Sequence, residues 1–69
     1  MIEVFKTDIQ EPAQVQHVVA VLVQHFPDSR INIDLHDCDK VLRIEGSNFL
    51  PGKIMMLLNE QGFRCAVLE

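Results

Sequence analysis

The tetrapeptide 36–39 holds the residues best suited to chemistry in this chain. It reads His36, Asp37, Cys38 and Asp39. An imidazole and a thiolate bind Zn(II) or copper, and carboxylates favour Zn(II). Asp-rich turns are also common for a structural reason, because the Asp side chain bonds to the backbone of the turn. The tetrapeptide therefore predicts either a transition-metal site, with copper or zinc as the ion, or an ordinary turn that holds no metal.

Six predicted elements surround this tetrapeptide. Alternation of apolar and polar residues predicts strands over 1–6, 30–36, 40–45 and 63–68. Apolar residues at helical spacing predict helices over 12–26 and 49–61. Pro12 suits the first turn of the first helix, Asn48 can cap the second, and Leu50 falls on its apolar stripe.

The order βαββαβ predicts one domain over residues 1–69 with an α+β, ferredoxin-like fold. Right-handed helical crossovers and a central hairpin give a four-stranded antiparallel sheet with strand order 4-1-3-2 and both helices on one face. This topology brings the polar loop 7–11 and the turn 37–39 to the same end of the sheet. Metal ligands, where a metal is bound, are then expected from these two loops: His36, Cys38, Asp8, Glu11, Asp37 and Asp39.

Composition excludes several classes of protein. The chain has 6 Lys and Arg against 10 Asp and Glu, so its net charge is −4, and it has no Trp or Tyr. Neither clustered cations for phosphates nor platforms for base stacking are present, so we expect no nucleic-acid binding. The longest apolar run, 18–23, is too short to cross a bilayer, so we expect no membrane insertion. Motifs of hydrolases, phosphate-binding loops and zinc proteases are missing, so we expect no enzyme.

The two cysteines indicate a reducing compartment. Cys38 and Cys65 are too few for a disulfide scaffold and form no C-x-x-C pair. Cys65 occupies an inward position of the last predicted strand, where a cysteine acts as a small hydrophobe. With no signal peptide visible at the N-terminus, we expect a cytoplasmic protein.

Three motifs are spread along the 69 residues. The first helix ends in V-x-x-L-x-x-x-F-P from Val19 to Pro27, the strand 31–35 reads I-N-I-D-L, and the chain closes with L-x-x-x-G-F-x-C-x-V from Leu58 to Val67. In this order, on a βαββαβ pattern, they resemble the heavy-metal-associated domain of small copper chaperones and of the N-terminal modules of metal-pumping ATPases. The resemblance implies this family's fold and a role in metal binding or transport.

The family's metal-binding motif is missing from this chain. Its chemistry depends on M-x-C-x-x-C in the first loop, where two thiolates hold Cu(I) or another soft ion. Here Pro12 and Val15 align with the cysteines, and a shift of one residue offers Glu11 and Gln14. Pro and Val cannot bind a metal, and oxygen ligands are too hard for Cu(I). The chain therefore resembles a divergent member that lacks the Cys-x-x-Cys motif, and no ligand of the family carries over.

Two functions from different classes follow. The first is a heavy-metal-binding or metal-transport-related small protein whose site uses His36 and Cys38. The alternative is a non-metal protein-interaction or dimerisation module that keeps only the fold, with another protein or a second copy as its partner. A strip of Phe5, Val41 and Leu68 is expected on the open face of the sheet and would favour self-association.

Overall fold

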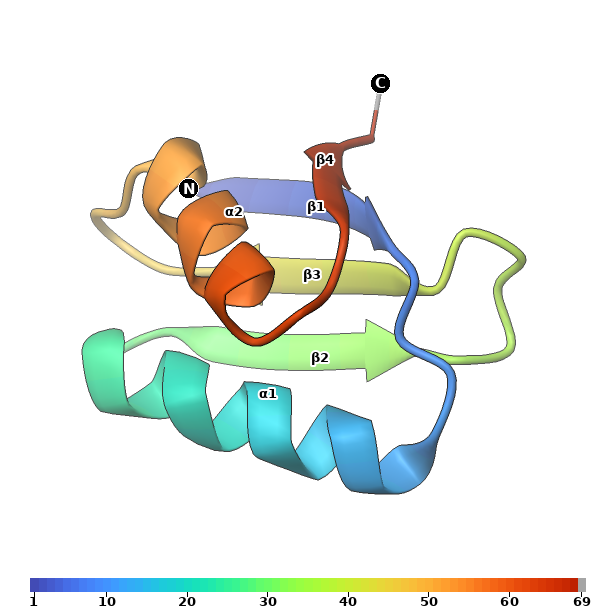
Figure 1. Ribbon diagram of the computed structural model, residues 1–69. Helices are drawn as coiled ribbons and strands as arrows, with labels where there is room; N and C mark the ends of the chain where they lie inside the picture. Colours follow the sequence, from blue (N-terminus) through green and yellow to red (C-terminus); the bar gives the residue numbers. More distant parts are fainter. Residues whose placement is uncertain (69) are drawn as a thin grey trace.

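The elements follow the predicted order. A computed structural model of the chain describes residues 1–68 (Figure 1). Each element begins and ends within a few residues of the predicted bounds. The elements are β1 (Ile2–Thr7), α1 (Pro12–His25), β2 (Arg30–Asp34), β3 (Val41–Glu45), α2 (Pro51–Glu60) and β4 (Cys65–Val67).

The four strands form one antiparallel sheet in the order β2-β3-β1-β4. This is the predicted order read from the other edge, and the α+β ferredoxin-like fold is confirmed. Both helices pack on the same face, because Leu22 of α1 and Leu58 of α2 share one core with Leu42 and Ile44 of β3. In Figure 1, α1 runs beside β2 and α2 crosses β1 and β3. Among residues 1–68, neither helix has the length and apolarity needed to span a membrane.

The prediction that Phe5 lies on the open face of the sheet is wrong. Phe5 is completely buried beneath the helices. Its register explains this position, since Phe5 pairs with Leu42 and with Val67, and directly opposed residues lie on the same face. Val41 and Leu68 are half-buried. Phe5, the largest of the three residues, therefore does not belong to the expected apolar strip on the open face.

The start of α2 also differs from the prediction. Leu50, expected in the buried stripe, is 73% exposed, whereas Phe49 is buried. The reason is Pro51, which takes the first helical position and forces the residue before it into an extended conformation. Leu50 accordingly has φ −105° and ψ 123° and is the N-cap of the helix, so Asn48 is not its cap.

The loop between β1 and α1 contributes to the core. Ile9, within the loop predicted to be polar, is fully buried among the core residues. The N–H of Ile9 donates to Thr7 Oγ1 at 3.3 Å, which turns the chain inward at this point. The loop is thus part of the packed interior.

Candidate functional site

The loop 35–40 joins β2 to β3 and is held by Thr7 of β1 and by its own Lys40. Thr7 donates its N–H to the carbonyl of Asp39 at 2.9 Å and its hydroxyl to the carbonyl of Lys40 at 2.6 Å. Lys40 Nζ donates to the carbonyl of Leu35 at 2.9 Å, and Lys40 N donates to that of Asp37 at 3.0 Å. The backbone of the loop is held mainly by Thr7 and Lys40, which are not among the predicted metal ligands.

Three predicted ligands meet in this loop. The ligand atoms of Asp37, Cys38 and Asp39 lie within 4.8 Å of one another, and no other group of three or more such residues forms among residues 1–68. Asp37 Oδ1 already accepts the N–H of Asp39 at 2.9 Å, which is the ordinary Asp turn. Asp37 and Cys38 are exposed, and Asp39 is half-buried. The arrangement could present one sulfur and two carboxylates to an ion.

Lys40 sets the geometry of the loop and was not distinguished by sequence reasoning. Its φ is 47°, in the left-handed region that non-glycine residues rarely adopt. This turn brings its N–H back to Asp37 and its ammonium back to Leu35. The only sequence signal is the position of Lys40 at the end of an Asp-rich turn, and that position does not reveal a left-handed residue.

His36 is not a member of the group. Its N–H donates to Asp34 Oδ1 at 2.9 Å, which makes a turn at the end of β2. Its side chain lines a shallow hollow between β2 and α1, together with Ile33 and Pro12. The structure therefore separates the imidazole from the Cys38 cluster.

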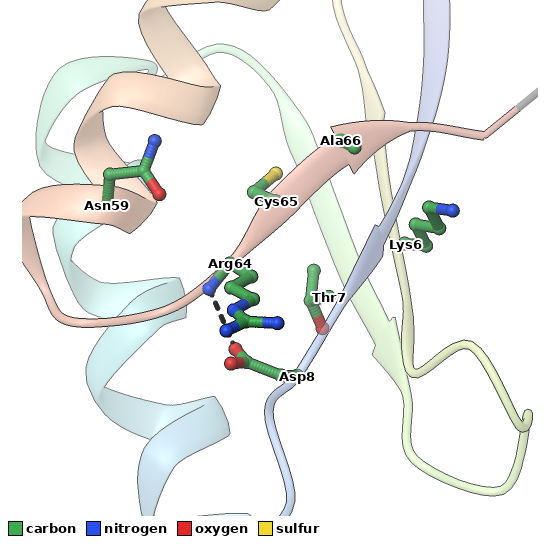
Figure 2. A pocket seen from close by; sticks show the side chains of 7 residues that line it. All are labelled: Lys6, Thr7, Asp8, Asn59, Arg64, Cys65 and Ala66. Carbon is green, nitrogen blue, oxygen red and sulfur yellow. Dashed lines mark hydrogen bonds between the residues drawn. The ribbon is translucent and has the colours of Figure 1, made fainter.

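Asp8 and Glu11 also lie outside the group. Asp8 turns toward β4, where its Oδ1 accepts the N–H of Arg64 at 2.8 Å, as Figure 2 shows. Glu11 is the N-cap of α1, and its N–H donates to Gln14 Oε1 at 3.1 Å. Both residues take part in bonds that hold loop 8–11 to its neighbours, and neither joins the Asp37 cluster.

The thiolate site of heavy-metal-associated domains does not fit the residues present here. Pro12 is the first residue of α1, and Val15 packs against the core. In the alternative alignment, Gln14 Oε1 accepts the N–H groups of Gln10 and Glu11 at 3.0 and 3.1 Å. No soft ligand stands at any of these positions.

Cys65 has a structural role, as part of the apolar packing around the core. It packs against the core, and burial raises the pKa of its thiol to about 12. The thiol therefore stays protonated at neutral pH, whereas metal binding and nucleophilic attack require the thiolate. Cys65 borders an open hollow of about 430 Å³ between α2 and the ends of β1 and β4, beside Asn59 and Arg64 (Figure 2). Both cysteines are free, and the prediction that Cys65 packs as a small hydrophobe is confirmed.

Comparison with known proteins adds no family. The sequence matches no family model, and no curated protein matches it significantly. The likeness to heavy-metal-associated domains thus stays a prediction, carried by the motifs of the sequence.

Proposed function

We propose that this protein binds a transition-metal ion through loop 35–40 and serves in metal handling, as a divergent relative of heavy-metal-associated domains. One observation carries the proposal: the ligand atoms of Asp37, Cys38 and Asp39 lie within 4.8 Å of one another. The loop is fastened through Thr7 and Lys40, so binding would require little rearrangement of its backbone. The proposal assigns no catalysis to the protein.

The donor set favours Zn(II) over Cu(I). One sulfur and two carboxylates suit a borderline ion, whereas Cu(I) prefers several soft ligands. Three protein ligands leave one tetrahedral position for water or for a ligand from a partner. Since Cys38 is exposed, an ion could be exchanged there. We place this function in the cytoplasm, where reducing conditions keep Cys38 as a free thiol.

Titration of the reduced protein with Zn(II) and with Cu(I), against competing chelators, tests this proposal. We expect one Zn(II) per chain, at least about tenfold weaker binding in Cys38→Ser, and weaker binding in Asp39→Asn. Matched controls are Cys65→Ala and Asp28→Asn, which change a cysteine and an exposed aspartate outside the loop. Equal affinity in Cys38→Ser, or affinity no greater than that of a scrambled 33–42 peptide, would contradict metal binding at this loop.

A second function is an interaction module that keeps the fold without the metal. The observation in its favour is that the two residues aligned with the family's cysteines have structural roles: Pro12 begins α1, and Val15 contacts the core. Failure of the titration would favour this function. Its partner would then be another protein or a second copy of the chain.

A further inference from the structure

β2 is an edge strand, and within residues 1–68 no other element bonds to the backbone on its outer side. Gly46, the residue after β3, donates its N–H to the carbonyl of Met1, the residue before β1, at 2.9 Å. Along an antiparallel strand, successive residues direct their backbone N–H and C=O groups to opposite sides. Gly46 and every second residue before it therefore bond to β1, whereas the residues between them bond to β2. Arg43 belongs to the second set and faces Asn32. Asn32 therefore bonds inward, and Ile31 and Ile33 direct their N–H and C=O groups outward.

The side chains of β2 are complementary to those of a reversed copy of the same strand. The strand reads Arg-Ile-Asn-Ile-Asp, with Arg30, Asn32 and Asp34 exposed and Ile31 and Ile33 half-buried. Reversing it about Asn32 places an arginine opposite an aspartate at both ends and an isoleucine opposite an isoleucine between them. Opposite charges in directly opposed positions stabilise a strand pair.

We propose that two copies of this protein pair through β2, antiparallel and about a two-fold axis at Asn32, and so form a continuous eight-stranded sheet. Ile31 and Ile33 of each copy exchange backbone hydrogen bonds with Ile33 and Ile31 of the other. Arg30 of each copy lies between Glu45 of its own β3 and Asp34 of the second copy. The proposal goes beyond metal binding and does not depend on it.

The helix beside this edge offers an apolar flank to the same partner. Pro12 and Gln16 line a hollow together with Ile33 of β2, so this side of α1 faces the edge. Val19 and Val23 follow these two residues at a spacing of seven and lie on the same flank. Val23 is 45% exposed. Two copies related by the axis at Asn32 would bring these flanks toward each other and cover their valines.

The opposite edge of the sheet lacks these features. β4 has only three residues, Cys65–Val67, and presents Ala66 on its exposed side. Reversal of this segment opposes no charges of opposite sign. A partner of unrelated sequence at β2 would need its own matching arrangement of charges, whereas a second copy supplies that arrangement by symmetry.

Charge reversal tests the pairing. Sedimentation velocity over a range of concentrations should show a monomer–dimer equilibrium for the unmodified protein. Arg30→Asp and Asp34→Arg should each raise the dissociation constant by about tenfold or more, because two attractive pairs become repulsive in each dimer. The double variant, which carries both reversals, should restore association, and Lys53→Asp on the exposed side of α2 should leave it unchanged. A protein that stays monomeric at about 1 mM, or a dimer insensitive to both reversals, overturns the proposal.

A cross-link tests the axis itself and does not depend on the charged residues. Asn32→Cys, introduced with Cys38→Ser, places two thiols opposite each other, at a Cα separation of about 4.5 Å that a disulfide can span. Mild oxidation should give a covalent dimer. The control Arg30→Cys in the same background should give none, because the two substituted positions lie about 13 Å apart along the strands. Cross-linking at 30 instead of 32 would place the axis elsewhere and refute this register.

Discussion

The two loops at the same end of the sheet use their side chains differently. In loop 8–11, Asp8 bonds to the backbone of Arg64, and Ile9 is buried in the core. In loop 35–40, the backbone is fastened through Thr7 and Lys40, and Cys38 is an exposed free thiol. The first loop uses its side chains to hold other parts of the fold, whereas the second is held by Thr7 and by its own Asp37 and Lys40 and keeps Cys38 as an exposed thiol.

This difference shows where a small domain can carry chemistry. A side chain that satisfies a neighbour's backbone or fills the core cannot be replaced without loss of stability. Thr7 links the two loops, because it closes β1 and holds both Asp39 and Lys40. The conformation of loop 35–40 therefore depends on the bonds made by Thr7, and replacing Cys38 leaves these bonds in place.

Ile9→Ala should have the largest effect on this comparison. Removing a fully buried isoleucine side chain should lower the free energy of unfolding by about 2–5 kcal/mol, because it leaves a cavity. Urea denaturation of both proteins measures the difference. Ile2→Ala is the control, since Ile2 is 51% exposed and its replacement should matter much less. Equal losses in the two variants would mean that loop 8–11 is no part of the core.

Gln14→Ala should have an intermediate effect. It removes the acceptor of the N–H groups of Gln10 and Glu11 at the start of α1. Loss of such capping lowers the free energy of unfolding by about 1 kcal/mol, which the same denaturation experiment resolves. Gln16→Ala, at an exposed position of the same helix, is the matched control. If both variants lose the same stability, helix propensity and not capping explains the loss.

Cys38→Ala should have the smallest effect on stability. The side chain is exposed, so the free energy of unfolding without metal should change by less than about 0.5 kcal/mol. Addition of Zn(II) should then stabilise the unmodified protein and leave the variant unchanged. The measurement is thermal unfolding with and without the ion. A large loss of stability in the variant without metal would show that loop 35–40, like loop 8–11, uses its side chains for the fold.

The element order, the strand order and most of the core were predictable from sequence periodicity. Val18 and Leu22 at helical spacing, and Leu42 and Ile44 at alternate positions, are buried as expected. The face of β1 was not predictable in the same way, because apolar residues occupy both of its faces. Phe5 is placed by its pairing with Leu42, which periodicity within β1 alone cannot reveal.

The candidate site was only partly predictable. Asp37, Cys38 and Asp39 are close in space because they are neighbours in one turn. The expectation that Asp8 and Glu11 would join them rested on topology, which brings loops to one end of the sheet without fixing where side chains point. A bond to Arg64 decides the direction of Asp8, and that contact spans 56 positions in the sequence.

The place of β1 in the sheet has a consequence for synthesis of the chain. β1 is translated before the other elements, but its two neighbours, β3 and β4, follow much later. At about 5–20 residues per second, roughly 3–12 s separate the addition of Thr7 from that of Val67. The hairpin of β2 and β3 can close within this time, while β1 still lacks its partner on the β4 side. An inner strand of the sheet is thus made before both of its neighbours, and its pairing is completed only when β4 has been added.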